Sequence, residues 1–148
     1  MFLKYCLYLI FVFNLTLSFA NSSKAAYVLA LAHSNIDLET AVTKAKESYQ
    51  IALKNQDLYY QAKSLFLVGW AQKKLKNYPE SANYYLKCFE LLHASKDTKT
   101  KKILISALKN LSHMMNDFQN HNFERQILKE AIIIGKDIAD TSHTIELY

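Results

Sequence analysis

The amino-acid sequence predicts an all-α protein in which antiparallel helix pairs stack on one another. Residues 62–97 and 105–140 share one pattern of small and apolar positions, so that Ala62, for example, matches Ile105, and a fainter copy lies upstream. The 148 residues include only two Gly and one Pro, too few for the many tight turns of a β-sandwich or barrel. A repeat of this kind indicates supersecondary units that bury their apolar faces against their neighbours.

The first element, residues 1–20, has the pattern of a secretory signal peptide. Lys4 supplies positive charge, residues 5–17 are mostly apolar, and Ala20 ends a cleavage site of small residues. The alternative is an uncleaved membrane anchor, because the uncharged run 5–23 is close to the length that spans a bilayer. The sequence therefore predicts an exported protein, periplasmic or secreted, with membrane contact only if this segment stays uncleaved.

The first pair of helices is predicted at 22–33 and 38–55. The first of these helices is short and rich in Ala. In the second, Ala41, Ala45 and Ser48 fall on one face, and a stripe of small residues lets a neighbouring helix approach closely. The loop between the two helices is short, so they must run antiparallel.

The remaining helices have recognisable start signals. Asp57 and Asp97 directly precede helices and are suited to cap their first turns. Asn77 and Glu80, three residues apart, resemble a capping box, and Pro79 is tolerated in a first turn. The predicted ranges are 58–75 and 78–93 for the second pair, and 98–118 and 123–138 for the third.

The stretch 65–92, LFLVGWAQKKLKNYPESANYYLKCFELL, resembles a tetratricopeptide repeat. In that family a Gly of the first helix packs against the neighbouring helix, an aromatic residue opens the second helix, and small residues recur along it. Here these positions hold Gly69, Tyr78, Ser81 and Cys88. The sequence departs from the family pattern at Gln72, where an aromatic residue is usual, and at Ser112, which replaces Gly in the third copy.

This resemblance implies a right-handed superhelix of about three repeats, at 21–57, 58–97 and 98–140, in one domain. The long repeat is similar to the exported sensor regions of bacterial histidine kinases and helix-turn-helix regulators. Residues 141–148 resemble either the start of a further helix or a C-terminal cap. The expected function is thus an interaction module, and the alternative is the N-terminal regulatory part of a longer signal-transduction protein.

Catalytic motifs and metal-ligand spacings are absent from the sequence, so no enzyme activity, cofactor or metal is expected. The formal charge of +5 comes almost entirely from Lys, with Arg125 as the single Arg. Because bidentate recognition of phosphates and bases favours Arg, nucleic acid is not an expected partner. Cys88 would be the one cysteine left after cleavage, and we expect it to be a small buried residue.

In the tetratricopeptide family the first helices of the pairs line a concave surface that binds peptides. Carried over by position, this surface comprises Lys63, Phe66, Trp70, Lys73, Lys109, His113 and Asn116. An aromatic pair flanked by lysines suits a peptide or protein with an apolar anchor and an acidic flank. The alternative is that Phe66 and Trp70 pack between repeats as part of the core.

Overall fold

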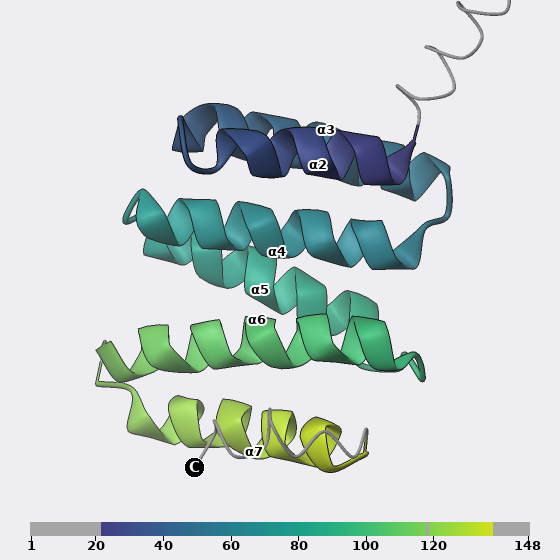
Figure 1. Cartoon of the computed structure of the whole chain (residues 1–148). Coiled ribbons are helices and arrows are strands. Elements are labelled where there is room, and N and C mark those ends of the chain that lie inside the picture. The colour runs from purple at the N-terminus through teal and green to yellow at the C-terminus, as the bar shows by residue number, and fades with distance from the viewer. Residues whose placement is uncertain (1–21, 118, 138–148) are drawn as a thin grey trace, which may run out of the picture.

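The computed structural model describes residues 22–117 and 119–137 (Figure 1). The predicted signal peptide and residues 141–148 lie outside this part of the chain. Within it, all regular structure is helical, which confirms the predicted all-α class. The helices are α2 (Ser23–His33), α3 (Leu38–Lys54), α4 (Leu58–Lys74), α5 (Tyr78–Leu92), α6 (Thr98–Asp117) and α7 (His121–Asp137).

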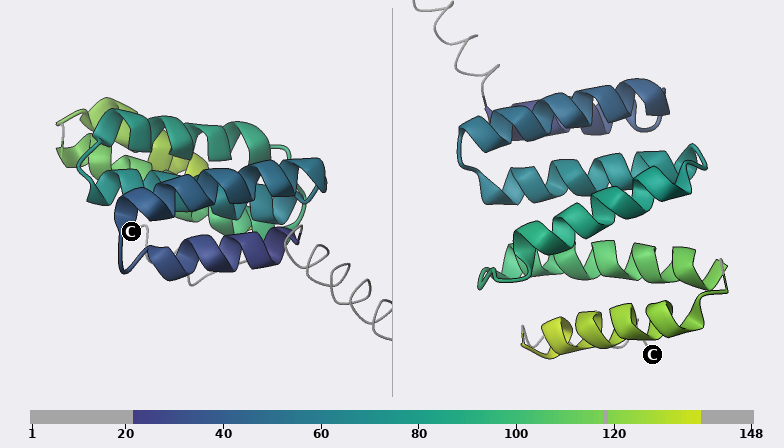
Figure 2. Two further views of the ribbon diagram at one scale, coloured as in Figure 1. Left: turned by 90° about the horizontal axis from the view of Figure 1, so that it is seen from above. Right: turned by 180° about the vertical axis from the view of Figure 1, so that it is seen from behind.

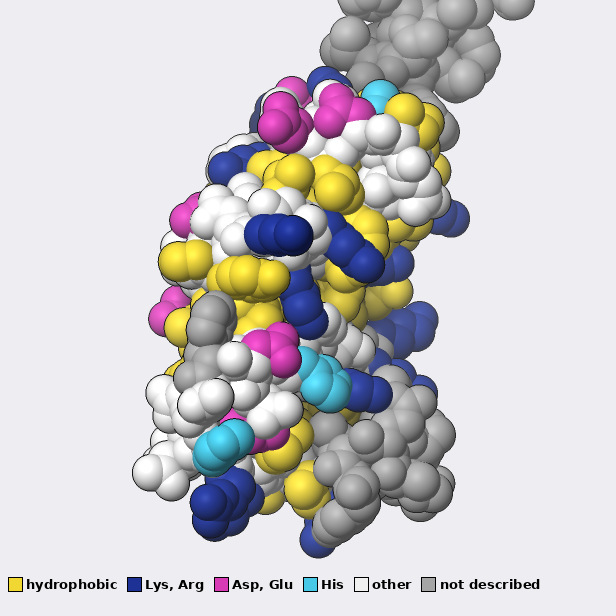
Figure 3. Space-filling model, turned by 90° about the vertical axis from the view of Figure 1, so that its left-hand side faces the viewer, with side chains coloured by type: hydrophobic (Ala, Val, Ile, Leu, Met, Phe, Trp, Pro, Cys, Tyr) yellow, Lys and Arg dark blue, Asp and Glu magenta, His cyan; other side chains and the backbone are white. Residues whose placement is uncertain are grey.

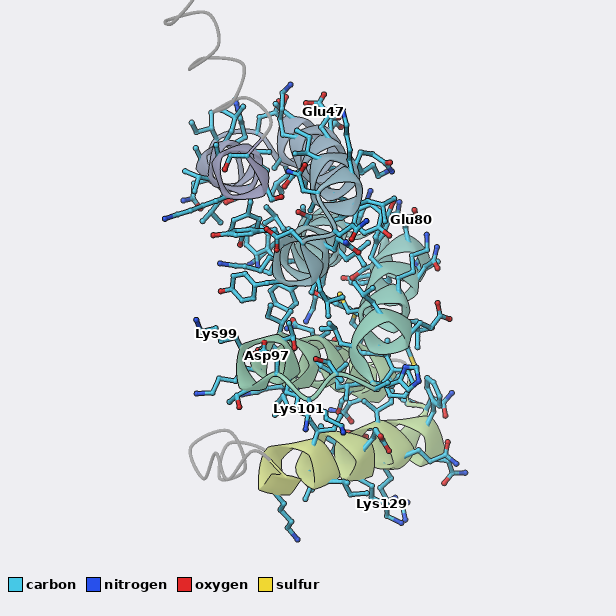
Figure 4. All side chains as sticks on the ribbon, turned by 90° about the vertical axis from the view of Figure 1, so that its right-hand side faces the viewer. Glu47, Glu80, Asp97, Lys99, Lys101 and Lys129 are labelled. Atoms are coloured by element: carbon cyan, nitrogen blue, oxygen red, sulfur yellow. The ribbon has the colours of Figure 1, made fainter. Side chains whose placement is uncertain are left out.

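The helices stack as consecutive pairs, from α2 and α3 at one end to α6 and α7 at the other (Figure 2). Each helix packs against the next in the chain, and α4 also packs against both α2 and α6. Consequently α2, α4 and α6 form one layer, with α3 and α5 behind it (Figures 1 and 4). This layer places the first helices of the three pairs side by side.

Two of the three predicted helix caps are confirmed. An Asp57 carboxylate oxygen accepts a hydrogen bond from the Tyr60 amide at 3.1 Å, and Asp97 accepts one from the Thr100 amide at 2.9 Å. The predicted capping box at Asn77 is wrong, because its side chain makes no capping hydrogen bond. Pro79 occupies the second position of α5 and has no amide hydrogen, which removes one of the two donors that an N-cap side chain normally binds.

The core consists of two clusters of buried side chains that both include α4. One cluster joins α2 and α3 to Leu67, Val68 and Ala71 of α4. The other joins Ala62 and Leu65 of α4 to α5, α6 and α7. Because α4 contributes to both clusters, it is the central element of the stack.

The stripe of small residues predicted on α3 is confirmed as a helix contact. Ala41, Ala45 and Ser48 are fully buried. The hydroxyl oxygens of Ser48 and Ser64 lie 2.8 Å apart, which joins α3 to α4 by a buried hydrogen bond. The hydrogen bond satisfies polar groups that would otherwise be costly to bury.

At Gly69 the backbone of α4 packs closely against the Tyr85 side chain of α5. A Cβ atom added to Gly69 would lie 2.8 Å from Cε1 of Tyr85, closer than real Cβ contacts. On the same helix pair, the Ser81 hydroxyl donates a hydrogen bond to the Gly69 carbonyl oxygen at 2.7 Å. The expectation that Gly69 packs against the second helix of its pair is therefore confirmed.

The cap at Asp97 predicts a pH dependence of stability. The hydrogen bond from the Thr100 amide lowers the pKa of Asp97 below its usual value of 3.8. A carboxyl group whose pKa is lower in the folded state stabilises the fold above the unfolded pKa, and the contribution disappears as the pH falls through the folded pKa. Asp97→Asn keeps a capping oxygen but cannot titrate. We expect melting temperatures of this variant to fall less steeply below about pH 4 than those of the native protein. Identical acid profiles would contradict the assignment.

Candidate functional site

A pocket of about 340 Å³ lies on the layer formed by α2, α4 and α6. Its residues come from all three helices, so it depends on the way the pairs stack rather than on one local motif. We call it the front groove. It is lined by Tyr27 of α2, by Tyr59, Lys63 and Phe66 of α4, and by Lys99, Lys102, Ile103 and Ser106 of α6.

Lys63 is held in place by three tyrosine rings. Its Nζ atom lies 4.4 Å from the ring centroid of Tyr27, 5.3 Å from that of Tyr59 and 5.8 Å from that of Tyr60. Cation–π contacts of this kind position an ammonium group without neutralising it. Burial, together with Tyr59 and Tyr60, raises the pKa of Tyr27, so this ring stays a neutral phenol. The cage thus presents a fixed positive charge on α4.

The opposite wall of the front groove is also basic. Lys99 and Lys102 of α6 line it, and Figure 4 shows Lys99 projecting on the side where α2 and α4 lie. Among the residues that the structure describes, the lining includes three lysines and neither Asp nor Glu. A cleft lined by charges of one sign attracts ligands of the opposite sign. The electrostatics of the groove therefore favour an anionic ligand.

The apolar surface of the front groove is supplied by Phe66 and Ile103, which are partly buried against the core cluster below. The Phe66 ring centroid lies 5.8 Å from that of Tyr85, at an interplanar angle of 49°. Lysine side chains also lie beside hydrophobic ones on the adjoining flank of the molecule (Figure 3). A ligand in the groove would meet apolar surface and positive charge together.

Of the site residues expected from the sequence, Lys63 and Phe66 line the front groove. Lys73 lies further along α4, where its ammonium group donates a hydrogen bond to the Asn110 side-chain oxygen of α6 at 3.4 Å. Trp70 is not among the lining residues. It is partly buried against the cluster of α2, α3 and α4, with Lys74 Nζ 5.7 Å from its ring centroid.

The three residues expected from the third repeat do not line the groove. Lys109 is partly buried, and His113 and Asn116 are exposed on α6. The lining residues that the sequence analysis missed are Tyr27, Tyr59, Lys99, Lys102, Ile103 and Ser106. A signal for Ser106 was present, because the repeat offset that relates Ala62 to Ile105 also relates the predicted Lys63 to Ser106.

Cys88 is fully buried, and its sulfur lies 3.7 Å from the Ala62 carbonyl oxygen. Burial raises the pKa of the thiol to about 12, so almost no thiolate exists at neutral pH. The expectation of a small buried residue is confirmed.

We predict that Cys88 reacts with an aromatic disulfide reagent only after unfolding. In a Cys6→Ser variant, which leaves Cys88 as the single thiol, colour development should be very slow in buffer and rapid in denaturant. Rapid reaction of the folded variant would contradict the burial of this side chain.

Within residues 22–117 and 119–137, no cluster of three or more His, Cys, Asp and Glu side chains is arranged to hold a metal ion. None of the helices in the same ranges combines the length and hydropathy needed to cross a membrane.

Comparison of the chain with models of protein families, with curated protein sequences and with solved structures found no match.

Proposed function

We propose that this chain is a non-enzymatic interaction module that binds a protein or peptide partner in the front groove. One observation carries the proposal: three lysines and two apolar side chains from different helices line the same groove, and the described part of the chain contributes no carboxylate to it. Fixed aromatic and aliphatic anchors supply most of the binding energy in protein interfaces, and complementary charge guides the encounter.

The positions of the lining residues also indicate the chemistry of the partner. An apolar side chain of the ligand would rest on Phe66 and Ile103, and acidic groups on either side of it would face Lys63, Lys99 and Lys102. Because the tyrosine cage already restricts Lys63, less side-chain entropy is lost when an anion binds there. The favoured ligand is therefore an acidic segment with one large apolar side chain.

We also propose that the three helix pairs form a right-handed superhelix like that of tetratricopeptide repeats, and that the protein is exported after cleavage behind Ala20. The close contact of Gly69 with Tyr85 and the single layer of first helices support the first part. The charge and hydropathy pattern of residues 1–20 supports the second. Mass spectrometry of the protein recovered from its native host tests export, because cleavage would leave Asn21 as the first residue.

The binding proposal is tested with a library of immobilised peptides that vary in acidic and apolar content. The protein should retain peptides that combine Asp or Glu with Phe, Leu or Trp. For a retained peptide, Phe66→Ala is expected to cost about 2 kcal/mol of binding free energy, as at an interface hot spot. Lys63→Gln should weaken binding less and reduce its dependence on salt concentration.

Lys129→Gln provides the matched control, since Lys129 is exposed on α7 and is not a lining residue of the front groove (Figure 4). It removes the same charge and should leave the affinity unchanged. If Phe66→Ala and Lys63→Gln bind the selected peptides as tightly as this control does, the front groove is not the binding surface.

A further inference from the structure

A second hollow, of about 560 Å³, lies on the other side of α4, between α3 and α5. We call it the back hollow. Leu65 and Val68 of α4 form its floor and are almost completely buried. The walls consist of Val42, Thr43, Lys46, Glu47, Tyr49 and Gln50 of α3 and of Tyr84 and Lys87 of α5.

Tyr84 joins the two walls of the back hollow. Lys46 reaches from α3 so that its Nζ atom lies 5.6 Å from the Tyr84 ring centroid, and Lys87 Nζ lies 4.8 Å from the same centroid. The Tyr84 ring also packs against both core clusters. The hollow therefore lies where the two clusters meet, beside an aromatic ring that is in contact with two lysine ammonium groups.

The charge of the back hollow is positive. Within residues 22–117 and 119–137, Glu47 is the one carboxylate that lines it, and it accepts a hydrogen bond from Lys44 Nζ at 2.8 Å. Lys44 is not a lining residue, so it balances Glu47 from outside and leaves Lys46 and Lys87 in excess. Two like charges beside an apolar floor attract an anionic group that has an apolar body.

We propose that the back hollow binds a small organic anion with a flat apolar body. The body would cover Leu65, Val68 and the Tyr84 ring, and its carboxylate, sulfonate or phosphate group would face Lys46 and Lys87. The volume falls within the range of about 300 to 1,000 Å³ that is usual for small-molecule sites. Because Lys46 bridges the two walls, the hollow suits a compact molecule better than an extended chain. This site is separate from the front groove.

The test uses two fluorescent dyes, anilinonaphthalene sulfonate and its uncharged counterpart phenylnaphthylamine, which differ in the sulfonate group. Both dyes are titrated into the full-length native protein and into the double variant Lys46→Gln/Lys87→Gln. The double variant should bind the sulfonate about fivefold to tenfold more weakly, since each exposed ammonium–anion contact changes affinity a few-fold. Its affinity for the uncharged dye should not change.

The double variant Lys129→Gln/Lys136→Gln is the matched control, because it removes the same charge from exposed positions of α7 that line neither the front groove nor the back hollow. It should bind the sulfonate with native affinity, whereas Tyr84→Ala should weaken the binding of both dyes. Circular dichroism melts establish that each variant is folded at the titration temperature. The proposal is overturned if the native protein does not bind the sulfonate, if Lys46→Gln/Lys87→Gln binds it with native affinity, or if the control weakens binding as much.

Discussion

Gly69→Leu is expected to lower the free energy of unfolding by about 3 kcal/mol, the upper end of the usual cost of overpacking a core. The leucine Cβ alone would meet Cε1 of Tyr85 at 2.8 Å, and the rest of its side chain would have to enter the same space. Tyr85 is fully buried and also lies against Phe66, so its ring has little room to move. For a domain of this size the melting temperature should fall by roughly 10 °C.

Gly69→Ala gives the sharper test, because close packing and backbone entropy predict opposite signs for its effect on stability. In an exposed helix position, replacing Gly by Ala stabilises a protein by about 0.5 to 1 kcal/mol through backbone entropy. Here the added methyl group meets the Tyr85 ring, so we expect a loss of stability instead. The stability lost on Gly69→Ala should be smaller when it is measured in a Tyr85→Leu protein than in the native protein. A Gly69→Ala protein that melts higher than the native one would show that α4 and α5 are packed differently.

The helices could be predicted because their signals are local. Apolar spacing along each segment and an Asp before α4 and α6 are properties of neighbouring residues. The cap at Asn77 failed for an equally local reason, since the pattern that suggested it did not account for the missing amide hydrogen of Pro79.

The candidate site was harder to predict because its walls belong to different helices. Lys63 and Phe66 could be found, since both follow one stripe of α4. Carrying Phe66 over by the repeat offset selected Lys109, whereas the groove on α6 is lined nearer the start of that helix, from Lys99 to Ser106. The part of α6 that lines the groove depends on its packing against α2 and α4, which is a tertiary property that a repeat pattern does not contain.

Trp70 could be either a ligand anchor in the groove or a core residue, and its surroundings distinguish the two. It lies four residues after Phe66, yet it is partly buried against the cluster of α2, α3 and α4 and is not among the lining residues of the front groove. Its neighbours therefore resemble those of a core residue more than those of a ligand anchor. Phe66, by contrast, both lines the groove and packs against the other cluster.

We therefore expect Trp70→Ala to cost about 3 kcal/mol of stability, the lower end of the range for truncating a buried aromatic residue, because part of its ring stays exposed. Trp70→Phe keeps most of the apolar contact and should cost less. Peptide affinity, measured well below the melting temperature of each variant, should change little for Trp70→Ala and strongly for Phe66→Ala. The opposite result, in which Trp70→Ala melts like the native protein but no longer binds the selected peptides, would make Trp70 a ligand anchor and extend the front groove along α4.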